Sequence, residues 1–205
     1  MLLSSAYLPP VQWFAHLKSA GEGAEVWVEQ CESYTKQTWR NRCLIATADG
    51  VQALTVPVVS AEGHQLMRDV RISDHGQWRH LHWNALEAAY RHTPFFDYYE
   101  DDFRPFYEQP YEFLFDFNMR LTELVCRLID LHPALRPTEE YVPEGQAGPE
   151  DYRALISPKQ DWHTADPAFQ PRPYYQVFAA RHGFQPNLSV VDLLFNMGPE
   201  SLLVL

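Results

Sequence analysis

The sequence lacks the segments that would place a chain in a membrane or in an oxidising compartment. It contains no uninterrupted run of about eighteen apolar residues, and this absence predicts that no helix spans a membrane. The first ten residues carry no charged segment ahead of their apolar positions, so we expect no secretory leader. Cysteine is scarce, and the three cysteines are Cys31, Cys43 and Cys126. Their number is odd and they form no C-x-x-C pair, so the sequence shows no disulfide framework. These absences predict a reduced, cytoplasmic protein.

Motifs that carry chemistry at a fixed spacing are also missing. Neither G-x-G-x-x-G nor G-x-x-x-x-G-K-[ST] occurs, so the glycine-rich loops that hold nucleotide phosphates are absent. No G-x-S-x-G elbow presents a nucleophilic serine. Four histidines, at 75, 80, 82 and 92, lie close together but form no H-E-x-x-H or other helical ligand pair. The sequence therefore predicts no metal site and points to no particular cofactor.

Basic residues are few compared with acidic ones. The chain has 16 Lys and Arg against 27 Asp and Glu, which gives a formal net charge of -11. General binding of nucleic acid or of an anionic membrane requires a broad basic surface, so this balance disfavours both. The composition, 46% hydrophobic and 14% aromatic, is sufficient for one substantial core. We expect a single domain over residues 1–205.

The first thirty residues predict a strand, a helix and a second strand. Residues 1–6 and 24–29 are short apolar runs, and residues 10–19 between them begin at a proline pair and end before Gly21. Such a unit is typical of a right-handed parallel crossover at the start of an α/β sheet. Ligands collect beyond the carboxyl ends of such strands, where residues 7–10 and 29–36 are expected.

The remainder predicts a hairpin, several helices and a long irregular segment. Residues 39–47 and 51–59 are extended runs joined by Asp49-Gly50, a strong hairpin signal. Helices are expected over 78–92, over 110–131 and after Asn187 or Ser189, and the aromatic residues of 95–111 are expected to pack in the core. Residues 133–173 are rich in proline and predict a long loop, either a flap over a site or a mobile linker. The fold class is therefore α/β with a mixed sheet.

A positive, aromatic-edged patch lies between residues 29 and 45. Lys36 with Arg40 or Arg42 can hold a phosphate or a carboxylate, while Tyr34 and Trp39 can stack on a sugar or a base. This patch predicts a small anionic or sugar ligand. The alternative is a strand whose arginines point to water or pair with carboxylates, and the pairing of Cys31 or Cys43 with a histidine base is a weaker possibility.

Several motifs resemble the WbqC-like family of bacterial proteins in both content and order. They cover most of the chain, and they are Tyr7 to Pro10, Tyr34 to Ile45, Leu54 to Val58, Trp78 with His82 and Tyr90, Pro94 to Phe96, Tyr175 to Phe178, and Pro186 to Gly198. The resemblance implies one WbqC-like domain over 1–205, and it associates the chain with bacterial surface-polysaccharide loci. It does not imply a defined reaction.

The residues and the resemblance together lead to a functional hypothesis. We expect a transferase-like enzyme acting on an activated sugar or amino sugar, or else a non-catalytic ligand-binding or scaffold protein of the same pathway. His82 and Asp192 are the candidate catalytic acid or base. The candidate ligand-binding residues are Tyr34, Lys36, Trp39, Asn41, Arg42, Trp78 and Asn187. A structural pairing of Asp192 with Arg42 is the alternative role for that carboxylate.

Overall fold

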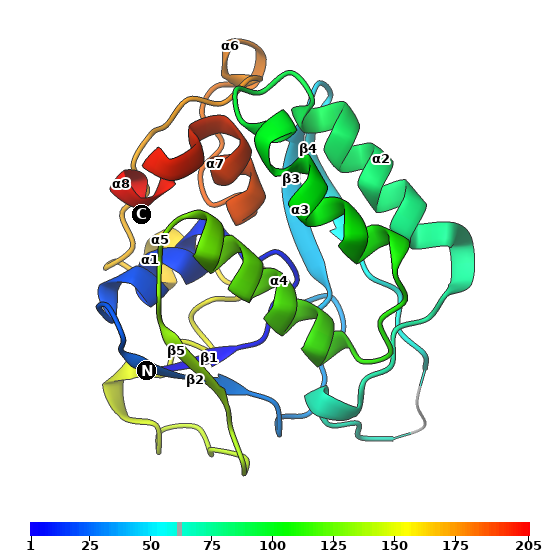
Figure 1. The fold of residues 1–205 in the computed structure, drawn as a ribbon. Helices are drawn as coiled ribbons and strands as arrows, with labels where there is room; N and C mark the ends of the chain where they lie inside the picture. The colour runs from blue at the N-terminus through cyan, green and yellow to red at the C-terminus, as the bar shows by residue number, and fades with distance from the viewer. Residues whose placement is uncertain (61–62) are drawn as a thin grey trace.

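The computed structural model describes residues 1–60 and 63–205 of the chain (Figure 1). Residues 61–62 lie outside the described part. The strands are β1 Leu2–Ser4, β2 Glu25–Glu29, β3 Arg42–Thr47, β4 Gly50–Thr55 and β5 Ala134–Pro137. The helices are α1 Val11–Ser19, α2 Trp78–Tyr90, α3 Phe96–Glu108, α4 Leu114–Leu128, α5 Trp162–Ala165, α6 Ala179–His182, α7 Val190–Met197 and α8 Ser201–Val204.

A parallel sheet forms from β1, β2 and β5, with β2 in the centre. The predicted strand-helix-strand start is confirmed, because α1 connects β1 to the parallel strand β2. Side chains alternate along a strand, so Val26 and Val28 of β2 enter the core while Trp27 between them lies on the opposite face. The fold is mixed α/β, as expected, although the antiparallel hairpin forms a sheet of its own beside the parallel one.

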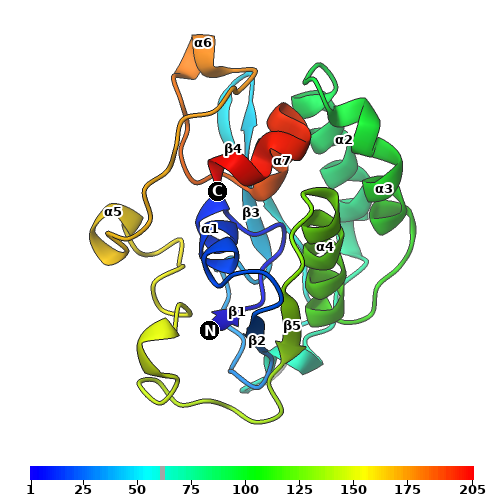
Figure 2. The same cartoon turned by 60° about the vertical axis from the view of Figure 1, so that its left-hand side comes forward.

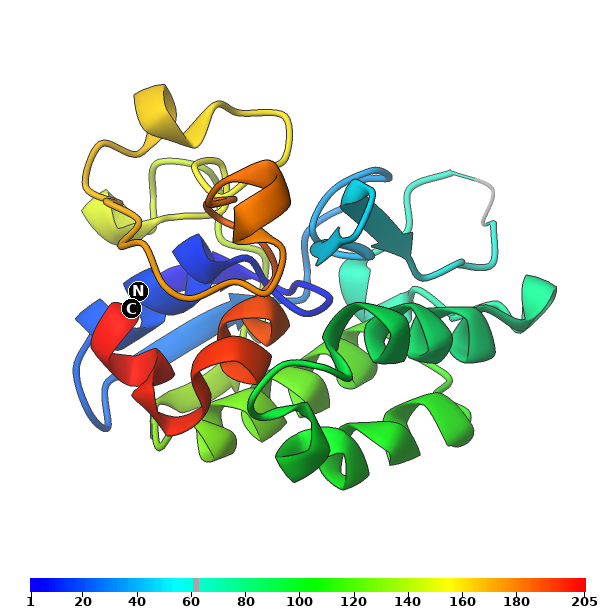
Figure 3. The ribbon, with the colours of Figure 1, turned by 90° about the horizontal axis from the view of Figure 1, so that it is seen from above.

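Strand β5 lies inside the segment that was predicted to be irregular. Residues 134–137 pair with residues 25–28 of β2, and Thr138 N continues the ladder to Val28 O at 3.0 Å. The expectation of a loop throughout 133–173 is therefore wrong at its beginning. From residue 138 to residue 185 the chain then crosses the side of the molecule opposite α2, α3 and α4 (Figure 3, yellow-green to orange).

The predicted hairpin is confirmed and is shorter than expected at its open end, since β3 begins at Arg42 and β4 ends at Thr55. Thr47 of β3 pairs with Gly50 of β4 across a tight turn, and Gly50 has φ +117°, a conformation that glycine adopts without strain. β3 begins at Arg42, so Arg40 precedes the strand. The prediction that Arg40 and Arg42 alternate on one strand face is therefore wrong.

Helices α2, α3, α4 and α7 pack together (Figures 1 and 2). Aromatic rings of α2, α3 and α7 contact one another between these helices. The aromatic stretch after residue 95 is helix α3, and its rings Phe96, Phe103 and Tyr107 are buried as predicted. Helix α7 is capped by Ser189, whose Oγ accepts from Val191 N at 3.4 Å, and the helix ends at Gly198. Both boundaries agree with the sequence prediction.

The starts of α1 and α7 are joined directly. Val11 N donates to Leu188 O at 2.9 Å, and Val190 N donates to Pro9 O at 2.8 Å. The first amide groups of a helix lack partners within their own helix, so each helix start completes the hydrogen bonding of the other. Residues from the two ends of the sequence thereby form one structural unit.

Candidate functional site

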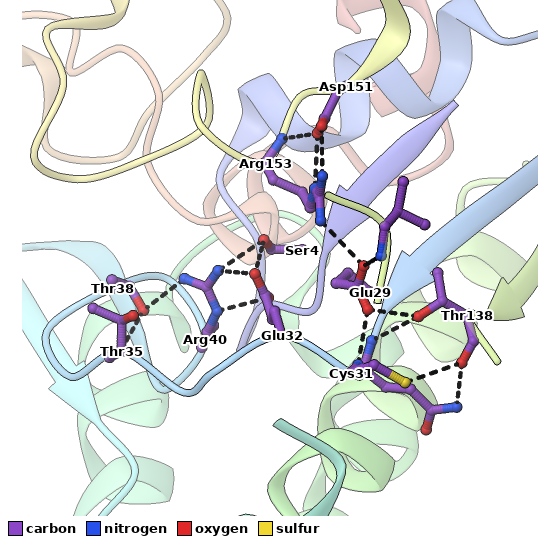
Figure 4. A network of polar contacts seen from close by, with 12 residues as sticks. Ser4, Glu29, Cys31, Glu32, Thr35, Thr38, Arg40, Thr138, Asp151 and Arg153 are labelled. Carbon is purple, nitrogen blue, oxygen red and sulfur yellow. Dashed lines mark hydrogen bonds and ion pairs between the residues drawn. The ribbon is translucent and has the colours of Figure 1, made fainter. Parts of the chain in front are cut away.

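A polar network lies at the carboxyl ends of the three parallel strands (Figure 4). Ser4 ends β1, Glu29 ends β2 and Thr138 follows β5. Because parallel strands place their carboxyl ends at the same edge, these three side chains meet there. Arg40 and Arg153 approach the same edge from the segment before β3 and from the segment after β5.

Glu29 is a fully buried carboxylate in the middle of the network. Its Oε1 accepts from Cys31 N at 2.8 Å and from Thr138 Oγ1 at 2.7 Å. Its Oε2 accepts from Val142 N at 3.2 Å and from Arg153 Nη1 at 3.1 Å. A buried charge needs such compensation, so Glu29 fixes the beginning of the 138–185 segment against the sheet.

Arg40 forms an ion pair with Glu32 in which both side chains are largely buried. Its Nε donates to Glu32 Oε1 at 2.8 Å, and its Nη2 donates to Glu32 Oε2 at 2.5 Å and to Ser4 Oγ at 3.0 Å. This two-pronged geometry fixes the guanidinium plane. The alternative that a patch arginine pairs with a carboxylate is thus confirmed for Arg40.

Arg153 makes a similar two-pronged pair with Asp151. Its Nε donates to Asp151 Oδ1 at 2.9 Å and its Nη2 to Asp151 Oδ2 at 2.6 Å. These hydrogen bonds hold the pKa of Asp151 below its usual range, against the opposing effect of partial burial. The carboxylate of Asp151 is consequently ionised at neutral pH.

Two small cavities are lined by both Arg40 and Arg153, which we call the arginine pair. One, of about 30 Å³, is lined by Ser4, Trp39, Arg40 and Arg153 among others, and is large enough for an ordered water molecule. The other, of about 100 Å³, is lined by Arg40, Arg153 and Tyr141 together with carboxylates. Arg40 and Arg153 thus line both cavities.

Trp39 contributes an indole N–H that has no acceptor among the described residues. The residue is only 9% exposed, its Nε1 is buried without a hydrogen-bond partner, and it lines the smaller cavity. An unpaired buried donor is costly and calls for an explanation. The atom itself has almost no accessible surface, so an acceptor in the cavity reaches this N–H only when neighbouring side chains shift.

The other predicted ligand-binding residues of the patch divide into two groups. Tyr34 and Asn41 each have a buried, unpartnered oxygen among the described residues, and burial raises the pKa of Tyr34 to about 12 while Arg40 opposes the shift. Lys36 is exposed, and Arg42 is half-buried with its Nε donating to Thr55 Oγ1 at 3.3 Å. Neither Lys36 nor Arg42 lines the two cavities described above.

His82 and Trp78 lie in an aromatic cluster of the core. The two rings make an edge contact with centroids 5.1 Å apart, and Tyr7 OH is 2.9 Å from His82 Nδ1. Burial lowers the pKa of His82 to about 4, so the imidazole is neutral at pH 7. The imidazole tautomer sets which of Tyr7 OH and His82 Nδ1 donates this hydrogen bond. The structure does not bring His82 to either cavity of the arginine pair.

Asp192 and Asn187 occupy a third location, near α7. Asp192 is fully buried and accepts from Tyr90 OH at 3.0 Å, Tyr174 OH at 2.7 Å and Gln176 Nε2 at 2.8 Å. Its carboxylate partners are therefore these three groups, and the expected pairing with Arg42 is wrong. Burial raises the pKa of Asp192, which the three donors oppose. Asn187 Oδ1 accepts from Gln12 N at 2.9 Å and so caps α1.

Most residues of the network were not predicted from the sequence. Glu29, Glu32, Thr138, Asp151 and Arg153 were not selected as candidate residues. The position of Glu29 and Glu32 beyond a predicted buried strand was the available signal, because the carboxyl edge of the sheet was already identified as the ligand-binding side. Asp151 and Arg153 carried no such signal, since they lie in the segment that was predicted to be irregular.

Two further findings concern the described residues 1–60 and 63–205. No group of three or more His, Cys, Asp and Glu side chains in this part is arranged to hold a metal ion. Within the same ranges, every helix is too short or too polar to cross a membrane.

The chain belongs to the WbqC-like protein family, whose sequence model matches residues 4–158. It is 30% identical over 227 residues to the uncharacterised protein Rv1507c of Mycobacterium tuberculosis, an alignment that covers 98% of this chain and 94% of that protein. No solved structure matches the chain significantly. The matched residues 4–158 contain the whole network described above, from Ser4 to Arg153.

Proposed function

We propose that the chain is a cytoplasmic, transferase-like enzyme that binds an activated sugar or amino sugar in bacterial surface-polysaccharide assembly. The observation that carries the proposal is that Trp39, whose indole N–H has no partner among the described residues, lines a cavity of about 30 Å³ beside Arg40 and Arg153, at the carboxyl edge of a parallel sheet. Such edges are the usual ligand sites of open α/β sheets. The biosynthetic context comes from the family resemblance.

The charges of the site favour a hydroxyl-rich group over a free multivalent anion. The two guanidinium groups are already paired with Glu32, Asp151 and Glu29, so the network as a whole is not cationic. Carboxylates accept hydrogen bonds from sugar hydroxyls, while guanidinium and indole N–H groups donate to them. The anionic part of an activated sugar would then extend towards exposed Lys36, which is retained from the sequence hypothesis.

A non-catalytic ligand-binding or scaffold protein of the same pathway is the second candidate. The observation that favours it is the completeness of the pairing, because Arg40 and Arg153 each make two-pronged bonds to a carboxylate of the chain itself. His82 and Asp192 also lie away from the arginine pair. Detection of a transferred product with a ligand that binds at Trp39 distinguishes the enzyme from the scaffold.

Trp39→Phe tests the site directly. The substitution keeps an aromatic ring and removes the N–H together with part of the ring volume, and no hydrogen bond between the described residues is lost. One ligand hydrogen bond contributes on the order of 1 kcal/mol, so the variant should bind the sugar nucleotide or phosphosugar identified by a thermal-shift panel about fivefold to tenfold more weakly. Isothermal titration calorimetry measures the difference.

Trp78→Phe is the matched control. Its indole Nε1 is also buried and unpartnered, but the ring lies in the core cluster with His82. Both variants should lose similar stability, and only Trp39→Phe should lose affinity. Equal affinities for the wild type and Trp39→Phe would refute the placement of the ligand, and no thermal shift with any sugar nucleotide or phosphosugar would refute the substrate class.

A further inference from the structure

A second polar pair lies outside the network described above, between α1 and the 138–185 segment. His16 Nε2 is 2.6 Å from Asp166 Oδ2, and Gln12 Nε2 donates to the same oxygen at 2.7 Å. Gln12 and His16 are four residues apart and therefore lie on one face of α1. All three side chains are buried.

The hydrogen bonds of Asp166 define the form of His16. Burial opposes ionisation of Asp166, but the bonds from His16 and Gln12 outweigh it and hold the pKa of Asp166 below its usual range. An ionised carboxylate only accepts, so Nε2 of His16 carries the hydrogen that it donates. In the neutral imidazole the other nitrogen, Nδ1, is then an acceptor, and it has no hydrogen bond with the described residues.

His16 lines a cavity of about 330 Å³, which is within the usual size range of small-molecule sites. Val11, Ala15 and Phe169 give the cavity apolar walls, and Arg172 contributes a guanidinium group. Nη1 of Arg172 donates to Leu203 O at 3.1 Å. Arg172 has no carboxylate partner among residues 1–60 and 63–205. The cavity thus combines apolar walls, a guanidinium group and the imidazole of His16, and it is also lined by Leu205, whose O accepts from Lys18 Nζ at 2.7 Å.

The geometry points to a binding site for a small organic acid that carries both a hydroxyl group and an apolar part. We propose that the carboxylate of the acid pairs with Arg172, and that its hydroxyl donates a hydrogen bond to Nδ1 of His16. Asp166 is a positioning residue, because it holds the imidazole in the form that leaves Nδ1 as an acceptor. The ring of Tyr152 packs on His16 with centroids 4.0 Å apart, and Tyr152 lines both this cavity and the smaller cavity at Trp39.

Two matched acids test the proposal. 3-Phenyllactate and 3-phenylpropanoate share the carboxylate and the ring and differ in one hydroxyl group. The wild type should bind 3-phenyllactate about fivefold more tightly, which corresponds to one hydrogen bond. Arg172→Gln should weaken both acids. His16→Gln should remove most of the preference, because the glutamine amide can keep the bond to Asp166 while the ring nitrogen is lost.

Nitrogen-15 spectra of the wild type give a readout that does not depend on any variant. His16 should show the Nε2–H form, and its Nδ1 resonance should move on addition of 3-phenyllactate and stay in place with 3-phenylpropanoate. His163, on the short helix α5 and exposed, is the internal reference. An Nδ1–H form, equal affinity for the two acids, or no binding of either overturns the proposal.

The outcome is separable from that of the proposed sugar site. Trp39→Phe should leave the affinity for 3-phenyllactate unchanged, since Trp39 lines the other cavity and not the His16 cavity. A loss of acid binding in Trp39→Phe would show that the acid occupies the arginine-pair site and would overturn the assignment to the His16 cavity.

Discussion

Glu29→Gln is the most informative perturbation of the network at the sheet edge. The carboxylate of Glu29 accepts from four donors and is fully buried. A glutamine side chain has the same shape, but it offers one oxygen and places an NH₂ group against donors. With the amide oxygen towards Cys31 and Thr138, the NH₂ group faces Val142 N and Arg153 Nη1.

The expected cost follows from those contacts. Removing one partner of a buried charge pair typically lowers stability by about 3–5 kcal/mol, because the other charge is left uncompensated. Arg153 keeps its two bonds to Asp151, so we expect the lower part of that range, about 3 kcal/mol. This is a large fraction of the about 5–15 kcal/mol by which domains are usually stable.

Urea denaturation followed by tryptophan fluorescence measures the change. The denaturation midpoint should fall while the dependence on urea stays the same, since the substitution alters one site and not the overall fold. Glu112→Gln is the control, because Glu112 forms an ion pair with Arg71 in which both side chains are more than half exposed, and it should change stability by less than about 1 kcal/mol. A loss below about 1 kcal/mol for Glu29→Gln would refute the view that this carboxylate organises the sheet edge.

Two further predictions concern the core. The pKa of His82 is lowered to about 4 in the folded chain, against about 6.5 in an unfolded chain. As the pH falls, the unfolded state therefore binds the extra proton before the folded state does. Through this group, the free energy of unfolding should drop by about 3 kcal/mol between about pH 6.5 and pH 4. Denaturation at a series of pH values should give a shallower profile for His82→Gln than for the wild type, and parallel profiles would contradict the assignment. Gly198→Ala should destabilise the chain by about 1–3 kcal/mol, because φ is +55° and a Cβ atom would lie 2.5 Å from the ring of Phe95. Gly21→Ala, at φ +92° with open space around it, isolates the backbone contribution in the same thermal melts, and an equal loss in both variants would show that Phe95 moves aside freely.

The elements that sequence analysis located correctly are those with local signals. The helix α1 begins after a proline pair, the hairpin turns at Asp49-Gly50, and α7 begins at a serine cap, so each boundary depends on residues close in sequence. Strand β5 has no such signal. Its four residues, Ala134–Pro137, end in proline and contain no β-branched side chain, and they become a strand because β2 offers an open edge.

The location of the candidate site could be predicted from the sequence, whereas most of the residues that form it could not. Parallel strands fix the ligand-binding edge, so the region after Glu29 could be selected from the order of elements alone. The arginine that reaches the site is determined by the first residue of β3. The strand begins at Arg42 and not at residue 39 as predicted, so Arg40 lies before the strand and pairs with Glu32. Arg153 reaches the edge through a segment whose path is determined by distant contacts, which the local sequence does not encode.

The hydrogen bonds that join the starts of α1 and α7 affect how the chain folds during synthesis. The first amide of α1 donates to the carbonyl of Leu188, and Gln12 N donates to the side chain of Asn187. Both acceptors are synthesised more than 170 residues after their donors. Contacts this far apart are slow to form because a long loop must close first. While a ribosome still holds the last part of the chain, the β1-α1-β2 unit would remain an incomplete fold with an exposed apolar face, and a molecular chaperone would have its longest opportunity to bind there.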